Sequence, residues 1–376
     1  IDPYVNMLRV TTQAFSAVNG GVNVLETVPF DSLLTQSDEF ANRIARNTQL
    51  ILGEESHLDH VTDPSGGSYY IETLSSELAQ QAWQYFREIE AAGGIIGALL
   101  SGKIVNDIKT VAGKRIKDVA SRRSVMVGVN QYANLKEEVR IVTKPDPKEI
   151  YDRRAEWLQK FRVSGSSGYH DSILVDLEKA KNESDITKQI DIAAELALKG
   201  ATLGEIFSHI KNSSEVTVSQ TLVIERPAEQ FERLRLRSAS HKAKTGSFPS
   251  IYLFNIGPVK QYKARADFSR GFFEAGGCEV INGRAVDNIN DGIAAAKESG
   301  AKVFVLCSTD DTYPQLVPEF TTGIRSVLPG SLCILAGYPK DQVDDHKRSG
   351  IDDFIFLGAD VVQIISSIFE KTGVAK

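Results

Sequence analysis

The stretch PSIYLFNIGPVKQYKARADFSRGFFEAGGCEVING, residues 249–283, decides the fold of the C-terminal third of the chain. Its apolar run at 251–256 is typical of a buried strand, and 264–275 has the spacing of an amphipathic helix that ends at two glycines. A second strand-like run follows at 278–282. Strand, loop, helix and strand in this order predict the first unit of a parallel α/β domain, in which the loop GPVKQYKAR after the first strand is the usual cofactor position.

The rest of this region, residues 249–376, continues the same alternation. Strand-like runs lie at 251–256, 278–282, 302–307, 331–336 and 353–357. Helical patterns lie near 264–275, 286–299, 313–327, 340–349 and 360–372. Such regular alternation predicts a five-stranded parallel sheet with helices on both faces, in flavodoxin-like strand order.

Residues 1–130 have mainly helical patterns. Ser37 is the expected N-cap of one helix, because two acidic residues follow it in the first turn. A second helix, in ETLSSELAQQAWQYFREIEAAGG, is expected to end at Gly93 and to turn five apolar side chains inward: Leu74, Leu78, Ala82, Phe86 and Ile89. Residues 20–28, GGVNVLETV, form the one expected strand. One strand cannot cover so many helix faces, so we expect a structure that precedes Ile1.

Residues 131–248 join the two regions through polar helices, expected around 148–161, 172–199 and 202–211. The basic tract RLRLRSASHKAKTG, residues 233–246, closes this linker. We interpret the tract as a solvated helix end, because Glu229 and Glu232 lie beside it, and keep a phosphate site as the alternative.

Composition excludes several classes of protein. The 376 residues are 42% hydrophobic and 24% charged, with a formal net charge of −6, so we expect no nucleic-acid partner and no membrane attraction. We find no run long enough to span a membrane and no signal peptide. Three cysteines in apolar strand-like runs, Cys278, Cys307 and Cys333, predict buried reduced thiols in a cytoplasmic protein.

Two long stretches carry a family resemblance: EFANRIARNTQLILGEESHLDHVTDPSGGSYYIETLSSELAQQAW, residues 39–83, and SVMVGVNQY, residues 124–132. They closely resemble the end of the barrel domain of adenosylcobalamin-dependent acyl-CoA mutases, with methylmalonyl-CoA mutase as the nearest family. The resemblance implies that residues 1–130 are the mostly helical tail end of a (β/α)8 barrel. It further implies that 131–248 is a helical linker and that 249–376 is a flavodoxin-like, cobalamin-binding-type domain.

The loop GPVKQYKAR, residues 257–265, departs from that family's cofactor motif. Cobalamin-binding members carry D-x-H-x-x-G there: the histidine ligates cobalt, the aspartate orients it, and the glycine lets the corrin approach the backbone. Aligned without gaps from the following helix, the three positions are Lys260, Tyr262 and Arg265. No histidine occurs between residues 243 and 345. The resemblance therefore predicts a degenerate site and no cobalamin bound by this chain.

Three later loops depart as well. After the third strand, the loop CSTDDTYPQLVPEF keeps the family's L-V-P but lacks the glycine-histidine before it. After the fourth strand, LAGYPKD keeps only one glycine, Gly337, of a usual pair. After the fifth strand, FIFLGAD stands in place of a G-P-G turn. This combination resembles the small subunit of heterodimeric methylmalonyl-CoA mutases. It implies a non-catalytic scaffolding chain whose large partner subunit holds adenosylcobalamin and interconverts methylmalonyl-CoA and succinyl-CoA.

Several alternatives stay open. The chain could be a stand-alone binding or regulatory protein with a repurposed pocket, a cobalamin-binding mutase in its own right, or a relative acting on isobutyryl-CoA. His57 and His60 would need a third ligand to bind metal, so no metal site is predicted. The stretch STDD, residues 308–311, resembles the phospho-acceptor loop of a receiver domain, but the acidic residues that a receiver needs after its first strand are missing. A nucleotide-binding site is not predicted either, because the motif G-x-G-x-x-G is absent. Residues 26–28 are a weak candidate for residual acyl-CoA contact. No residue is predicted to be catalytic.

Overall fold

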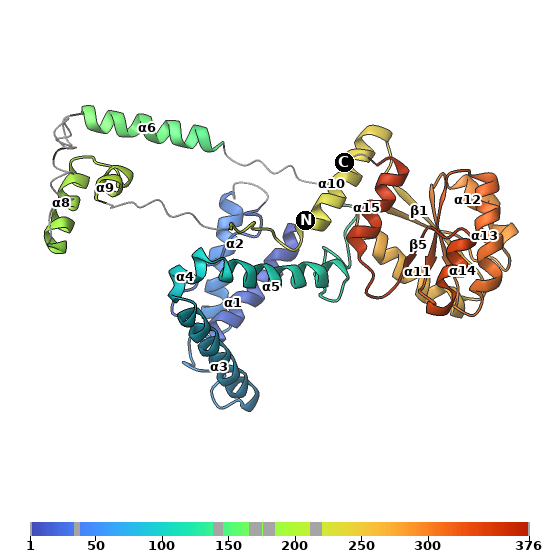
Figure 1. Ribbon diagram of the computed structural model, residues 1–376, viewed down its shortest axis with the longest axis horizontal. Helices are drawn as coiled ribbons and strands as arrows, with labels where there is room; N and C mark the ends of the chain where they lie inside the picture. Colours follow the sequence, from blue (N-terminus) through green and yellow to red (C-terminus); the bar gives the residue numbers. More distant parts are fainter. Residues whose placement is uncertain are drawn as a thin grey trace. The chain divides into compact units, whose positions relative to one another are not determined.

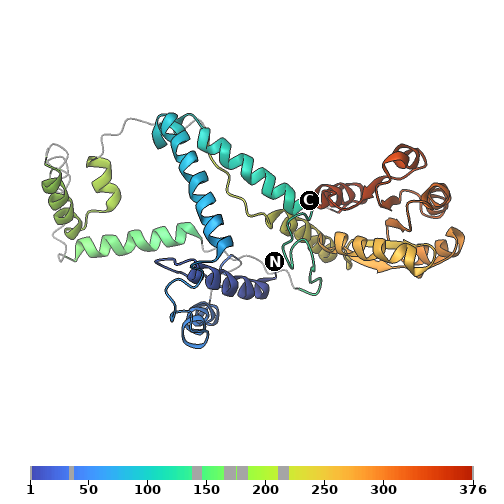
Figure 2. The same cartoon turned by 90° about the horizontal axis from the view of Figure 1, so that it is seen from below.

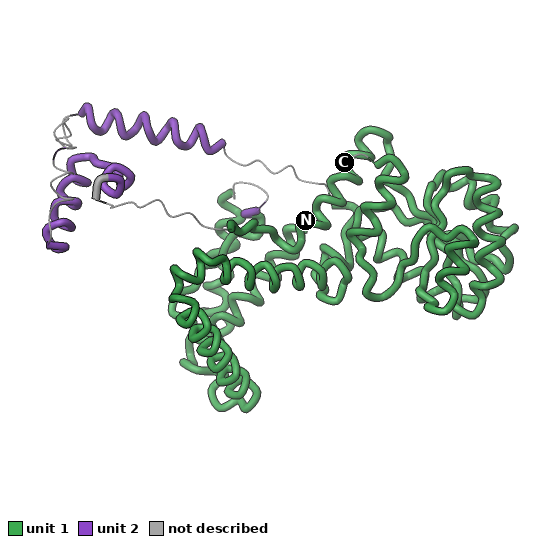
Figure 3. Tube along the Cα trace, viewed as in Figure 1, with its two compact units in different colours: residues 1–31, 37–141, 220–376 green, residues 32–36, 142–219 purple. Residues whose placement is uncertain are grey.

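The computed structural model describes residues 2–33, 38–137, 146–164, 175, 185–210 and 220–374. Two compact units make up the chain (Figure 3). The larger unit combines residues 1–31, 37–141 and 220–376, and the smaller one combines 32–36 and 142–219.

A five-stranded parallel sheet forms the centre of the C-terminal region, as predicted (Figure 1). Its strands are β1 (Ser250–Asn255), β2 (Glu279–Asn282), β3 (Val303–Cys307), β4 (Leu332–Ala336) and β5 (Asp353–Ile355). The strand order β2-β1-β3-β4-β5 confirms the flavodoxin-like topology. The three central strands are almost wholly buried, which explains why their sequences are continuous apolar runs rather than alternating ones.

Helices cover both faces of this sheet (Figure 1). They are α11 (Val259–Glu274), α12 (Ile289–Glu298), α13 (Tyr313–Val327), α14 (Val343–Arg348) and α15 (Val361–Thr372), with a short 3₁₀ turn at Lys340–Gln342. One apolar cluster packs α11, α15 and the preceding α10 (Glu229–Thr245) against one face, and a second packs α12 and α13 against the other. Phe272 and Phe320, one in each cluster, are fully buried.

The first 130 residues are helical, in agreement with the sequence pattern. The helices are α1 (Pro3–Asn19), α2 (Glu39–Leu50), α3 (Tyr69–Ala91), α4 (Gly94–Leu100) and α5 (Lys103–Ala120), with a π-helical turn at Ile51–Glu55. The expected N-cap, Ser37, lies outside the described residues. Asp38 caps α2 instead, because its carboxylate accepts a hydrogen bond from the Ala41 amide at 2.8 Å.

Two predictions for this region are wrong in the described structure. Residues 20–28 form no strand and pair with no strand that the structure describes, although their composition favours a strand. Helix α3 buries none of its side chains: Leu78 is 68% exposed and Phe86 is 48% exposed. Figure 2 shows these helices in blue and teal with no strand among them. Among the described residues, no strand lies beside residues 20–28 to pair with them, and no apolar surface buries the side chains of α3.

The smaller unit contains α6 (Pro147–Val163), α8 (Ile186–Leu198) and α9 (Leu203–Ile210). Arg162 joins them, because its guanidinium donates to the Gly200 carbonyl and pairs with Glu205 at 2.6 Å. The expected helix around 172–199 is confirmed from residue 186 onward. Most of its first part lies outside the described residues. The three-part division at residues 130 and 248 stays a prediction.

A buried arginine joins the 121–131 loop to the α/β region within the larger unit. Arg235 of α10 is 8% exposed. Its Nε donates to the Ala275 carbonyl at 3.1 Å, and its Nη2 donates to the carbonyls of Gly128 at 2.9 Å and Val129 at 2.7 Å. Asn130, fully buried, holds the loop's own turn by accepting from the Met126 amide at 2.7 Å. Arg235 therefore links the α/β region to the loop, and Val129 of the loop packs into the same apolar cluster as α10 and α11.

The three cysteines are free and buried, as predicted. Burial raises the pKa of the Cys307 thiol to about 12 and that of Cys333 to about 12, so both remain protonated at neutral pH. Unlike a reactive thiol, none of the three is exposed.

Replacing Arg235 with methionine should lower the free energy of unfolding by about 2–4 kcal/mol, because three buried carbonyls lose their donor. Urea unfolding followed by circular dichroism measures this change. Arg233→Met, on the same helix but 59% exposed in its side chain, is the matched control and should change stability by less than about 0.5 kcal/mol. Equal effects of the two variants would contradict the assigned role of Arg235.

His346 of α14 should make stability depend on pH. Burial lowers the pKa of its imidazole below the ordinary value of about 6.5, although Asp345 and Asp310 oppose the shift. Between the two pKa values the unfolded chain binds more protons, so stability rises with pH there. The contribution of the neutral His346 side chain to the free energy of unfolding is complete above pH ~6.5 and is lost as the pH falls below this value. The fall in unfolding free energy between about pH 7 and 5.5 should be smaller in His346→Gln. Identical slopes would disprove this.

Candidate functional site

The carboxyl ends of β1 and β3 form the position where this fold binds ligands. The strand order reverses there, because β2 lies on one side of β1 and β3 on the other. The connections after β1, β3, β4 and β5 converge at this edge. The candidate site of the sequence analysis therefore lies at the topological switch point.

Most of the expected loop GPVKQYKAR is helical. Helix α11 begins at Val259, directly after Gly257 and Pro258, so Lys260, Tyr262 and Arg265 all lie in its first two turns. Gly257 makes the sharp exit from the strand with φ of 87°. The sequence pattern predicted a start at 264, which is wrong: Pro258 at the N-cap has its φ fixed by its ring, and the good helix formers Lys260 and Gln261 extend the helix back to Val259.

The three positions point to different surroundings. Lys260 is exposed. Tyr262 is half-buried and packs against the apolar cluster beneath α11. Arg265 extends to the connection after β3, where its Nη2 lies 2.9 Å from Oδ1 of Asp310. The structure thus does not bring the three together; it places one of them, Arg265, across the switch point.

Gly337, at the end of β4, leaves the space that the Arg265–Asp310 pair occupies. Its φ is 150°, and a Cβ at this position would lie 2.7 Å from Nη1 of Arg265 and 3.0 Å from Oδ1 of Asp310. The retained glycine of LAGYPKD therefore accommodates an ion pair in this chain. The side chains are 32% and 48% exposed, so solvent reaches the pair.

Tyr313 fixes the ends of the neighbouring strands. Its fully buried hydroxyl lies 2.7 Å from the Ala336 carbonyl and accepts a hydrogen bond from the Ser308 amide at 3.2 Å. Burial raises the pKa of this phenol, which stays neutral. Beside it, Tyr338 packs on Phe356 with ring centroids 4.5 Å apart, which covers the end of β5.

The residues at this edge do not fit a corrin. No imidazole stands at the position of the cobalt ligand, and a guanidinium stands where the motif has glycine. Between residues 249 and 374, His346 is the only histidine. It is buried against the ring of Tyr313 and contacts Gln342 Oε1 at 3.0 Å. We assign no catalytic step to this edge.

The other candidates of the sequence analysis gain little support. The rings of His57 and His60 stack 4.7 Å apart, but no cluster of three or more metal-ligating side chains exists among the described residues. Of residues 26–28, Thr27 is used structurally: its hydroxyl donates to the Ala45 carbonyl at 2.7 Å and accepts from Gln49. Asp310 of STDD is the partner of Arg265, a contact that the sequence analysis missed.

The described helices include none that is both long and apolar enough to cross a membrane.

Comparisons with known proteins agree with the resemblance. Residues 1–216 match a family model described as methylmalonyl-CoA mutase. The methylmalonyl-CoA mutase small subunit of Streptomyces virginiae is 31% identical over 374 residues, covering 100% of this chain and 48% of the relative. That of Porphyromonas gingivalis is 29% identical over 376 residues, covering 99% and 49%. A methylmalonyl-CoA mutase of Cereibacter sphaeroides is 26% identical, covering 98% and 53%. The chain spans about half the length of these relatives.

Gly337→Ala should lower the free energy of unfolding by about 1–3 kcal/mol, because it adds backbone strain and displaces the ion pair. In an Arg265→Ala background, the cost of Gly337→Ala should be smaller by about 0.5–1.5 kcal/mol, since the shortest contact of the added Cβ, with Nη1 of Arg265, is gone. A double-mutant cycle in urea measures this coupling. Additivity within about 0.3 kcal/mol would show that Arg265 does not fill the space above Gly337 in solution.

Proposed function

The chain belongs to the methylmalonyl-CoA mutase family, and we propose that it acts as the non-catalytic small subunit of an adenosylcobalamin-dependent mutase. Its partner is a large subunit that binds the cofactor and interconverts methylmalonyl-CoA and succinyl-CoA. The naming of several relatives as small subunits supports this role. The work of this chain is then to stabilise and position the large subunit.

The observation that carries the proposal is the Arg265–Asp310 pair at the switch point. It lies where the resemblance places the motif glycine, and Gly337 below it gives the pair its space. The radical rearrangement depends on cobalt–carbon homolysis, so the difficult chemistry belongs to the cofactor. A chain that offers no cobalt ligand depends on another subunit for that step.

The exposed apolar surface of the first 130 residues supports an assembly role. Six large apolar side chains of α3 are between 48% and 92% exposed: Tyr69, Tyr70, Leu74, Leu78, Trp83 and Phe86. So much exposed apolar surface on one helix is typical of a surface that is covered in the complete protein. We propose that residues 1–130 form the tail end of a barrel and that the assembled barrel meets the large subunit.

Mixing experiments test the proposal. The purified chain, in its full natural length, is combined with an equimolar large mutase subunit and analysed by gel filtration with absorbance at corrin wavelengths. We expect one complex with one corrin per pair of subunits, and turnover of methylmalonyl-CoA rather than isobutyryl-CoA.

A full-length chain that stays separate from the large subunit would contradict the role of subunit and favour a stand-alone binding or regulatory protein. Two corrins in each complex would contradict the non-catalytic assignment. Turnover of isobutyryl-CoA instead would leave the proposed subunit arrangement standing and would contradict the proposed substrate, methylmalonyl-CoA.

A further inference from the structure

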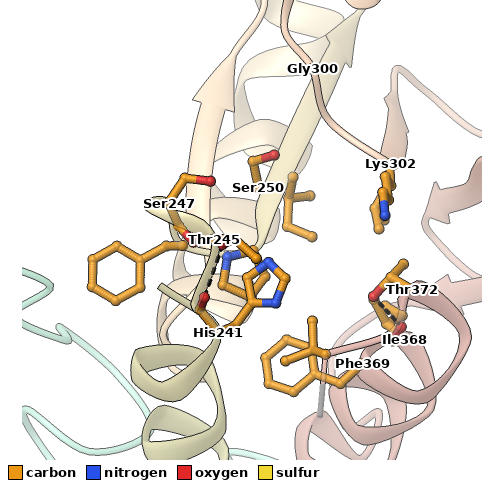
Figure 4. A pocket seen from close by; sticks show the side chains of 14 residues that line it. His241, Thr245, Ser247, Ser250, Gly300, Lys302, Ile368, Phe369 and Thr372 are labelled. Carbon is orange, nitrogen blue, oxygen red and sulfur yellow. Dashed lines mark hydrogen bonds between the residues drawn. The ribbon is translucent and has the colours of Figure 1, made fainter. Parts of the chain in front are cut away.

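A cavity lies at the opposite edge of the sheet from the switch point. It has a volume of about 250 Å³ and lies between the end of α10, the starts of β1 and β3, and the end of α15 (Figure 4). Its lining consists of fourteen residues: His241, Thr245, Ser247, Phe248, Pro249, Ser250, Ile251, Gly300, Lys302, Val303, Ile368, Phe369, Thr372 and Val374. The proposed subunit role does not use this cavity.

The charged lining is entirely basic. Lys302 and His241 lie on opposite sides of the cavity in Figure 4, and none of the fourteen lining residues is an aspartate or glutamate. This is unusual for a chain whose net charge is −6. A concave surface with basic groups and no acid favours an anion over a cation.

Two helices end at the cavity, and three carbonyls near their ends accept hydrogen bonds from the chain. Thr245 Oγ1 donates to the His241 carbonyl at 2.9 Å, and Thr372 Oγ1 donates to the Ile368 carbonyl at 2.7 Å. The Val374 amide donates to the Phe369 carbonyl at 2.9 Å. Among the described residues, no hydrogen bond joins the Lys302 ammonium or the His241 ring to a carbonyl of either helix end, although the helix dipoles reduce the attraction for an anion by a few tenths of a kcal/mol or more.

Four polar groups remain for a ligand. Within the described ranges, the Lys302 ammonium, the His241 ring and the hydroxyls of Ser247 and Ser250 make no hydrogen bond or ion pair with the chain. Three apolar side chains, Ile251, Val303 and Phe369, are buried and supply a hydrophobic floor. Arg237 lies over the ring of Phe369 at 5.3 Å, which brings a further positive charge close to this floor.

We propose that this cavity binds a small organic anion. A carboxylate or phosphate group interacts with Lys302, His241 and the serine hydroxyls, and a short apolar body rests on the floor. The volume is below the roughly 300–1,000 Å³ of pockets for drug-sized ligands, so it suits a small anion better than a nucleotide or a whole acyl-CoA. Binding here would stabilise the joint between α10 and α15, so the site would act on the α/β domain from the edge opposite the switch point.

Titration of the full chain with four probes tests this site: butyrate and butyl phosphate as anions, and butyramide and butanol as neutral counterparts. Chemical shifts of the His241 ring and the thermal midpoint are the measurements. We expect at least one anion to bind at millimolar concentration or below, and neither neutral compound to bind. The stronger anion distinguishes a carboxylate site from a phosphate site.

Lys302→Met and His241→Gln should each weaken binding of that anion about threefold to tenfold, the range for a partly exposed charge-assisted contact. Lys244→Gln is the matched control, because Lys244 is a nearby exposed lysine outside the lining, and it should leave the affinity unchanged. Circular dichroism confirms that each variant is folded. The proposal fails if no anion binds, if the neutral compounds bind equally well, or if Lys244→Gln weakens binding as much as Lys302→Met.

Discussion

The ion pair between Arg265 and Asp310 sets the chemistry of the carboxyl edge of the sheet. Its energy is modest, about 0–1 kcal/mol, because both groups are partly exposed. Its geometric effect is larger, since the pair spans the ends of β1 and β3 above Gly337, where the strand order reverses. At an edge that is a ligand crevice in doubly wound folds, the chain's own side chains thus occupy the space above Gly337.

The fold is retained because its support lies elsewhere. Two apolar clusters, one on each face of the sheet, hold β1, β3 and β4, and most of their side chains come from the strands and the covering helices. Arg235 binds the sheet region to the loop at 121–131 through backbone carbonyls, and Val129 of that loop packs into one of these clusters. Such a division between framework and site lets one architecture carry different sites.

Sequence reasoning succeeded where local signals suffice. The apolar runs that became β1, β3 and β4 are buried on both faces, so their pattern had no competing explanation. It failed where the structure of a segment depends on a neighbouring segment. Residues 20–28 have the composition of a strand, but no neighbouring strand pairs with them in the described structure. Leu78 has the spacing of a buried helix position, but no core packs against it. The Arg265–Asp310 contact joins residues 45 positions apart, and nothing in either local pattern indicates the other.

The most direct test of the closed edge is an equilibrium titration of the purified chain with hydroxocobalamin and adenosylcobalamin, followed by absorbance and gel filtration, with a large mutase subunit as positive control. The account predicts that the chain retains no corrin at tens of micromolar, a concentration at which a binder with Kd near 1 μM would be almost saturated. Stoichiometric retention, above all with a spectrum that shows a displaced lower base, would contradict it.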